Sequence, residues 1–338
     1  MKKCSLVIIL ILLLVISILG CKQKETEIYF ENGKNILESI INEIILGEFN
    51  NDNGRYDKAI LEFNKAIDIN PKFAEAYAYR SRAYSGKGDF DQGYSDANVA
   101  IELDANLAYA YYARGYVYGG RIVNNISNSR DDQAISDYNK AIELDPNLIV
   151  ALNNRGGIYN RKGNYDLAIA DYSQIIEVNP GALIAYINRG RIYDRKGDYD
   201  LAIADFSQVI KINQEYEYFL IRGLCYRKNG DYNLALIDFT EAIKLNSKNY
   251  NIYIRRGLTY RLLFDYELAM KDFETALQIQ PNNSIAKKNL EQILSIIEGN
   301  HFNFLENLQQ GVLSAPEEER SIHRLLLNII ISNLENDE

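Results

Sequence analysis

The chain has 338 residues, 47% of them hydrophobic and 25% charged, a composition typical of folded proteins. Its formal net charge of −9 argues against a nucleic-acid partner, because such proteins use an excess of Lys and Arg to neutralise phosphates. The three cysteines lie far apart, and His301 and His323 form no metal-binding motif, so the sequence predicts no disulfide framework, metal or cofactor.

The amino-terminal segment has the pattern of an export signal. Lys2 and Lys3 precede an uncharged run over 4–21, after which the sequence turns polar at Lys22. A basic start followed by a short apolar stretch is typical of a signal peptide. The run of eighteen residues is also at the lower limit for crossing a bilayer, so an uncleaved membrane anchor is the alternative.

The apolar run ends in the letters ILGC, and Cys21 is its last residue. This ending resembles the lipobox of bacterial lipoproteins, with a branched apolar residue three places before the cysteine and a small residue directly before it. Leu19 is bulkier than the residue usual at the place between them. The resemblance implies cleavage after Gly20, a diacylglyceryl group on the Cys21 thiol and acylation of the new amine. Several acyl chains give a stable membrane anchor, whereas one binds only marginally.

The lipoprotein resemblance divides the first part of the chain into a signal peptide over 1–20 and a lipidated spacer over 21–31. It also implies a location in the bacterial cell envelope, where the chain would be lipid-anchored to the membrane on its periplasmic or surface side. The alternative, a cysteine that ends an apolar run by chance, implies neither the anchor nor the location.

The chain then becomes repetitive. The stretch NRGGIYNRKGNYDLAIADYSQIIEVNP at 154–180 recurs thirty-four residues later as NRGRIYDRKGDYDLAIADFSQVIKIN at 188–213. Small residues recur at repeat positions 8 and 20, large ones at positions 4, 11 and 24, and proline at position 32. This pattern resembles the tetratricopeptide repeat, a helix-turn-helix unit. The resemblance implies an all-α fold, a right-handed superhelical solenoid of about seven repeats with a C-terminal helical cap.

We place the solenoid over 32–298 and a C-terminal helical extension over 299–338. The repeats are predicted at about 40–73, 74–107, 108–148, 149–182, 183–215, 216–249 and 250–283, followed by a capping helix at 284–298. Most of the 26 tyrosines fall at repeat positions that pack between helices, so most of this aromatic content is predicted to be core.

One polar pair recurs with the repeats. Six of them carry arginine at position 7 and aspartate at position 23, whereas the first has Leu46 and Glu62 at these places. Because a guanidinium matches a carboxylate with two parallel hydrogen bonds, we predict a charge-assisted pair. The pair would fix the angle between the two helices of a repeat, or between neighbouring repeats.

Function is expected where the pattern leaves residues free. In the tetratricopeptide family, positions 2, 5, 9, 12 and 13 of the first helix line the groove that holds partners. The third repeat has Tyr109, Tyr112 and Tyr116 on one stripe of this helix, and rigid rings are enriched where proteins bind partners. The alternative is that the stripe packs against a neighbouring helix. An insertion within Gly119–Asp132 follows, either a binding loop or a tolerated surface bulge.

The fourth and fifth repeats offer a polar, partly basic groove strip, which could hold an acidic peptide or a carboxylate. The strip includes Asn153, Arg161, Arg191 and Arg195. It does not match the family's carboxylate clamp, which has lysine at position 5 and asparagine at position 9. The sixth and seventh repeats are apolar at the corresponding places, and an amphipathic helix predicted after Ser314 would either cap the last repeats or fill this apolar groove.

No motif for catalysis emerges, because the chain has no phosphate-binding glycine loop and no nucleophile elbow. We therefore expect a non-enzymatic scaffold in the cell envelope that binds other proteins or peptide segments, with a lipid anchor in the membrane and no small-molecule substrate. An assembly role rests on analogy with envelope lipoproteins of this architecture. The alternative is a surface-exposed structural or host-interacting lipoprotein with no assembly role.

Overall fold

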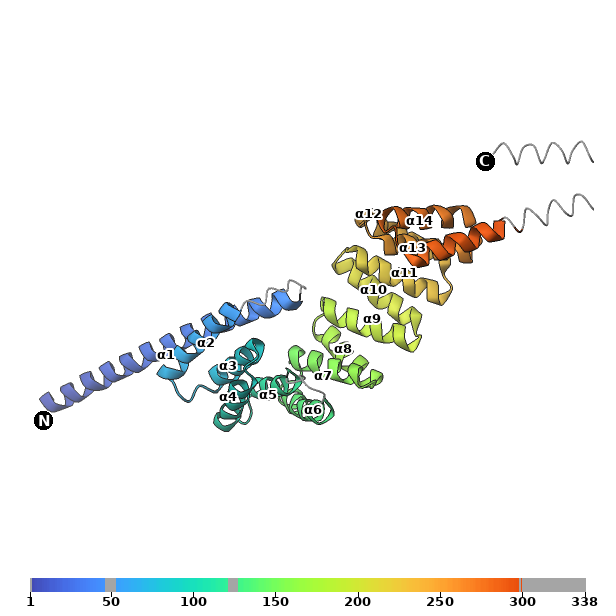
Figure 1. Cartoon of the computed structure of the whole chain (residues 1–338). Helices are drawn as coiled ribbons and strands as arrows, with labels where there is room; N and C mark the ends of the chain where they lie inside the picture. Colours follow the sequence, from blue (N-terminus) through green and yellow to red (C-terminus); the bar gives the residue numbers. More distant parts are fainter. Residues whose placement is uncertain (1, 46–52, 121–126, 298, 300–338) are drawn as a thin grey trace, which may run out of the picture. The chain divides into compact units, whose positions relative to one another are not determined.

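A computed structural model describes residues 2–45, 53–120, 127–297 and 299 (Figure 1). The predicted all-α fold is confirmed, and the described residues contain no strand. The chain divides into two compact units, Met1–Gly197 and Asp198–Glu338. The helices of the first unit are α1 (Lys2–Ile45), α2 (Asn53–Ile69), α3 (Ala74–Lys87), α4 (Phe90–Leu103), α5 (Ala108–Gly120), α6 (Ser127–Leu144), α7 (Ile149–Arg161), α8 (Tyr165–Val178) and α9 (Leu183–Lys196). Those of the second are α10 (Tyr199–Ile212), α11 (Tyr216–Asn229), α12 (Tyr232–Leu245), α13 (Tyr250–Leu262), α14 (Tyr266–Ile279) and a last helix at 284–297.

Within each unit an odd-numbered helix A packs on the even-numbered helix B that follows it, and each such pair is one repeat, as in α1–α2, α3–α4, α5–α6, α7–α8, α11–α12 and α13–α14 (Figure 1). The turn from A to B is short where glycine takes the left-handed conformation, as at Gly88 with φ 93°, and in the last repeat Phe264 takes this place with φ 63°. Several B helices end at an Asn or Asp in extended conformation, such as Asp104, whose side chain accepts the N–H of Asn106 at 2.8 Å. These two local signals set the helix-turn-helix period.

The two helices of a pair approach closely where the sequence has glycine at position 8. A Cβ on Gly223 would lie 2.8 Å from Cε1 of Phe239, which is closer than any real Cβ contact. The aromatic ring at position 24 therefore packs directly on the backbone of helix A. Rings at this position are almost completely buried, and they are Phe63, Tyr138, Tyr172, Phe206, Phe239 and Phe273. The predicted burial is thus confirmed for the rings at position 24, whereas the tyrosines at positions 4, 11 and 17, apart from Tyr56, are only half-buried.

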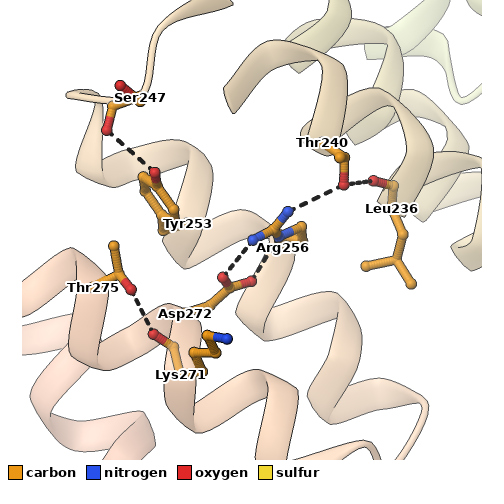
Figure 2. A network of polar contacts seen from close by, with 8 residues as sticks. All are labelled: Leu236, Thr240, Ser247, Tyr253, Arg256, Lys271, Asp272 and Thr275. Atoms are coloured by element: carbon orange, nitrogen blue, oxygen red, sulfur yellow. Dashed lines mark hydrogen bonds and ion pairs between the residues drawn. The ribbon is translucent and has the colours of Figure 1, made fainter. Parts of the chain in front are cut away.

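The predicted arginine–aspartate pair is also confirmed, and it does more than join two helices. Nε and Nη2 of Arg256 donate to the two carboxylate oxygens of Asp272 at 2.9 and 2.8 Å, while Nη1 donates to Thr240 Oγ1 of the preceding repeat at 3.1 Å (Figure 2). Hydrogen bonding to Asp272 raises the pKa of Arg256, so the guanidinium stays charged. One arginine thus ties together both helices of its repeat and the repeat before it.

The same two-way bonding recurs along the chain. Arginine pairs with aspartate within a repeat at Arg80–Asp96, Arg114–Asp137, Arg155–Asp171 and Arg222–Asp238. The third donor reaches a polar side chain of the preceding repeat in Arg80–Asn64, Arg114–Asn98, Arg155–Asn139, Arg189–Ser173 and Arg222–Ser207. The acceptor of this third hydrogen bond is the side chain at position 25 of the preceding repeat. This role of position 25 was not predicted from the sequence.

The first repeat aligns differently from the sequence prediction of 40–73. A Cβ on Gly33 would lie 2.7 Å from Cε1 of Phe63, so Gly33 makes the close approach that defines position 8 elsewhere. Asn32 precedes it and donates from Nδ2 to Glu62 Oε2 at 3.4 Å, in the place of the arginine–aspartate pair. The residues first assigned to these positions, Gly47 and Leu46, lie outside the described part of the chain. Helix α1 therefore supplies the first helix A, upstream of the predicted position.

The segment predicted as a spacer, 21–31, continues α1. Its Thr26 is buried, and the ring centroid of Phe30 lies 4.9 Å from that of Phe73 and 5.3 Å from that of Tyr79. Packing of the repeats therefore begins inside this segment, because the first helix A starts earlier than the thirty-four-residue period indicates.

The last described helix, 284–297, packs on the seventh repeat as a helix A without a partner in the described chain. Ala286 and Ile293 are fully buried in the cluster that also holds Ile254 and Phe273. The predicted C-terminal helical extension, 299–338, lies outside the described residues except for residue 299.

Candidate partner-binding site

The three tyrosines predicted to form a binding stripe lie together on α5. Ring centroids of Tyr109 and Tyr112 are 5.0 Å apart, and those of Tyr112 and Tyr116 are 6.3 Å apart. Tyr109 also stacks on Tyr79 of the preceding repeat, with centroids 4.0 Å apart and planes 9° from parallel. The stripe therefore joins α3 and α5 as one aromatic cluster in the first unit.

Arg82, which the sequence reasoning missed, lies inside this cluster. Its Cζ is 3.6 Å from the centroid of the Tyr116 ring, and its Nε donates to the Tyr112 hydroxyl at 3.4 Å. Arg82 is only 4% exposed, and within the described chain its Nη1 has no hydrogen-bond partner. The signal was present in the sequence, since Arg82 occupies position 9 of the second repeat, one of the groove positions.

The tyrosines offset the buried charge of Arg82 without ionising. Burial raises the pKa of Tyr79 to about 12 and also raises those of Tyr109 and Tyr112, so their phenols are neutral at neutral pH. Ring faces and a phenol oxygen attract a cation through their partial negative charge. The cluster is thus a shielded cation within aromatic packing.

The stripe is only partly available to a partner. Tyr112 is 3% exposed and packs near Tyr138, whereas Tyr109 and Tyr116 are half-buried. The alternative considered for the sequence, packing against a neighbouring helix, therefore describes Tyr112. A partner-binding role for the stripe stays a prediction, and only Tyr109 and Tyr116 offer surface for it.

The polar strip separates into engaged and unengaged residues. Nη2 of Arg161 donates to Asp131 Oδ1 at 2.8 Å, and Nη1 of Arg195 donates to Asn160 Oδ1 at 3.0 Å. Asn153 is half-buried on α7. Arg191 on α9 is exposed, and its guanidinium makes no hydrogen bond or ion pair to any described residue. Of the three predicted groove arginines, Arg191 is the one whose charge no described residue engages.

The basic residues in the turns between helices A and B join successive repeats. Each lysine bonds an aspartate at the start of helix B in the preceding repeat, in Lys87–Asp57, Lys162–Asp132 and Lys196–Asp166. Asn229 reaches Asp200 in the same way at 3.2 Å. Exposed pairs of this kind contribute little to stability individually, because water and salt screen them. Their regular spacing indicates a role in aligning successive repeats.

The described residues offer neither a metal-ligand cluster nor a helix that could span a membrane. Among the described residues, no three His, Cys, Asp or Glu side chains gather as metal ligands. In that same part of the chain, no helix is both long and apolar enough to cross a membrane.

The repeat geometry and the family comparisons agree. Models of the tetratricopeptide repeat match residues 126–148, 147–215, 216–249 and 250–283, and a TPR repeat model matches 51–88. Together these matches cover more than half of the chain, which belongs to the tetratricopeptide repeat family. Proteins of this family bind other proteins or peptides and are typically non-enzymatic scaffolds.

One of the similar solved structures shows the same fold over most of this chain. The C-terminal part of a TPR repeat-containing protein from Cytophaga hutchinsonii is 19% identical, with a TM-score of 0.59, over 77% of this chain and 99% of that one. YrrB, described as a TPR protein with an unusual peptide-binding site, is 21% identical, with a TM-score of 0.49, over 57% of this chain and 96% of that one. Pseudomonas aeruginosa PilF is 17% identical, with a TM-score of 0.49, over 65% and 97%. A search of curated proteins gives no match.

Proposed function

We propose that this chain is a non-enzymatic, lipid-anchored scaffold of the bacterial cell envelope that binds a partner protein or peptide segment on the A-helix face of its repeats. The observation that carries the binding role is that the fold bonds most arginines of helix A but leaves an exposed one, Arg191, without a partner in the described chain. Five of the arginines at position 7 pair with an aspartate of their own repeat, and Arg189 donates to Ser173 of the preceding repeat. By contrast, Arg191, at position 9 of the same helix as Arg189, is exposed and makes no hydrogen bond or ion pair to any described residue.

Partner binding on this face has a physical basis. An exposed guanidinium and half-buried aromatic or amide side chains on A helices can supply charge-assisted hydrogen bonds together with rigid contact area. Arg191 supplies the charge, and Asn153 and Tyr116 supply side chains that packing leaves partly accessible. A repeat scaffold holds such groups at fixed spacing, so a bound segment would lose little energy to reorganising its receptor.

The proposed anchor fits the local structure of α1. The Cys21 side chain is exposed, so its thiol would be accessible to an acylating enzyme. The apolar clusters to which α1 contributes begin at Tyr29 and Phe30 and extend to Ile40. Cleavage after Gly20 would therefore leave the first helix pair intact.

Fatty-acid labelling in a bacterial host tests the anchor. We expect the wild-type chain to incorporate a labelled fatty acid and to fractionate with membranes, because Cys21 would carry the acyl groups. The Cys21→Ala variant should lose the label and the membrane fractionation. Cys225→Ala is the matched control, since this second cysteine is buried in α11, and it should keep both. Label retained in Cys21→Ala would contradict the lipoprotein assignment.

A further inference from the structure

Two arginines of the second unit lack the acceptor that this fold elsewhere provides. Arg227 on α11 and Arg255 on α13 are both half-buried. Neither guanidinium forms a hydrogen bond or ion pair with any described residue, and Nε of Arg255 is buried without a partner. By contrast, Arg222 and Arg256 on the same two helices each hold a bidentate aspartate. A partly desolvated guanidinium without an acceptor is costly.

The repeat register shows what is missing. Arg227 occupies position 12 of the repeat at 216–249, and Arg255 occupies position 6 of the repeat at 250–283. One repeat later, the same two positions hold Arg261 and Asn289, and Nη1 of Arg261 donates to Asn289 Oδ1 and, at 2.9 Å, to Gln292 Oε1. The position 12 arginine of the seventh repeat, Arg261, thus donates to amide oxygens of the last helix. The position 12 arginine of the sixth repeat, Arg227, instead meets a second cation, Arg255.

The two cations act on each other. Burial and the charge of Arg255 both lower the pKa of Arg227, and only the phenol of Tyr232 acts in the opposite direction. The chain has 46 Asp and Glu residues, yet none of those in its described part is among the groups that act on Arg227. Arg82, a buried arginine that also lacks a carboxylate partner, is shielded by the Tyr116 ring at 3.6 Å, whereas neither Arg227 nor Arg255 lies over a ring in the described chain.

We propose that Arg227 and Arg255 form an anion-binding site that takes a carboxylate of a bound protein segment. Two guanidiniums from adjacent A helices can each donate to one oxygen of the same carboxylate, which removes their mutual repulsion and satisfies buried donors. This inference rests on the proposed protein-binding function and names the chemistry of the partner, an acidic segment. Free phosphate shares the oxyanion chemistry and is the second arm of the test.

The experiment uses the purified full-length chain and two blocked, fluorescent peptides, hexaglutamate and hexaglutamine. Because the chain is acidic, with a net charge of −9, hexaglutamate is repelled by the molecule as a whole, and its binding reports a local basic site. We expect wild type to bind hexaglutamate in fluorescence anisotropy and not hexaglutamine. Inorganic phosphate should compete only weakly, because it offers the pair a single oxyanion without the attached segment.

Two variants and one control complete the test. Arg255→Asn recreates the Arg261–Asn289 pairing one repeat earlier, so it should keep or raise Tm while weakening hexaglutamate binding about ten-fold or more. Arg227→Gln should weaken binding similarly. Lys248→Gln removes one exposed positive charge from the same unit and should change the affinity less than about two-fold.

The proposal is overturned if wild type does not prefer hexaglutamate, if Arg255→Asn and Arg227→Gln weaken binding no more than Lys248→Gln, or if phosphate binds while hexaglutamate does not. Each of these results would leave the general scaffold function standing, since that function is tested separately by cross-linking from the first unit.

Discussion

Two arginines on α3, two residues apart, illustrate how differently the same side chain is used. Arg80 is bonded by Asp96 through Nε at 2.7 Å and Nη2 at 2.8 Å, whereas Arg82 is enclosed by tyrosines and has no carboxylate partner. Removing one member of a buried ion pair leaves the other charge unpaired, which costs about 3–5 kcal/mol. Removing a buried cation that has no counter-charge leaves nothing unpaired.

We therefore predict opposite outcomes for two matched substitutions. Arg80→Met should lower the free energy of unfolding by about 3 kcal/mol because it strands the Asp96 carboxylate. Arg82→Met should stay within about 1 kcal/mol of wild type, since methionine fills an aromatic site and the lost cation–π attraction is offset by the lost desolvation penalty. Urea unfolding of both variants measures the difference. Equal losses would contradict the description of Arg82 as a cation without a partner.

The aromatic cluster also predicts how stability depends on pH. Burial raises the pKa of Tyr79 from 10.0 to about 12, so the folded state holds this phenolic proton more tightly than the unfolded state does. The stabilising contribution is complete below pH 10 and is lost as the pH rises toward about 12. Tyrosinate absorbance followed together with circular dichroism should show unfolding within this window. Tyr79→Phe should weaken the pH dependence, and an unaltered profile would contradict the assignment.

At the scale of a helix, sequence reasoning succeeded where the repeat is regular. Glycine at position 8, the ring at position 24 and the arginine–aspartate pair were all predictable, because each repeats with a fixed period and has one packing role. The first repeat was not, because its two helices are joined by a longer connection than the period allows. Asn32 and Gly33 take the roles of positions 7 and 8, but they lie farther in sequence from Glu62 and Phe63 than the thirty-four-residue repeat predicts.

Substituting alanine at two glycines separates the two alignments of the first repeat. Gly33→Ala should lower the free energy of unfolding by about 1–3 kcal/mol, because the added Cβ would lie 2.7 Å from the Phe63 ring. Gly47→Ala is the matched change at position 8 of the predicted 40–73 repeat, and it should lower the free energy of unfolding by less. Thermal unfolding of the two variants compares them directly. A larger loss for Gly47→Ala would restore the 40–73 alignment.

The candidate site was less predictable than the fold for a physical reason. A groove position in sequence says which face a side chain occupies, but not whether a neighbour engages it. Arg161 and Arg195 looked equivalent to Arg191, yet the first two bond Asp131 and Asn160. Likewise, Tyr109, Tyr112 and Tyr116 occupy equivalent positions in the sequence pattern. Only the structure distinguishes Tyr112, because Tyr138 of α6 packs beside it.

At the scale of the whole molecule, only a short segment separates the proposed membrane anchor at Cys21 from the repeat scaffold. The packed fold begins near Phe30, a few residues after Cys21. If Cys21 is lipidated, the first repeats would therefore be held close to the membrane, and partners would be captured there. The binding face, rather than the anchor, is the central claim, because the anchor only sets where the scaffold works.

The most direct test places a photo-crosslinking amino acid at position 191 of the chain in its native cells, with the same amino acid at position 170 as control. Arg191 is exposed on the A helix α9, and Ala170 is exposed on the B helix α8 of the same unit. Binding on the A-helix face predicts discrete cross-linked adducts from position 191 and none from position 170. Adducts of equal yield from both positions, or none from position 191, would contradict it.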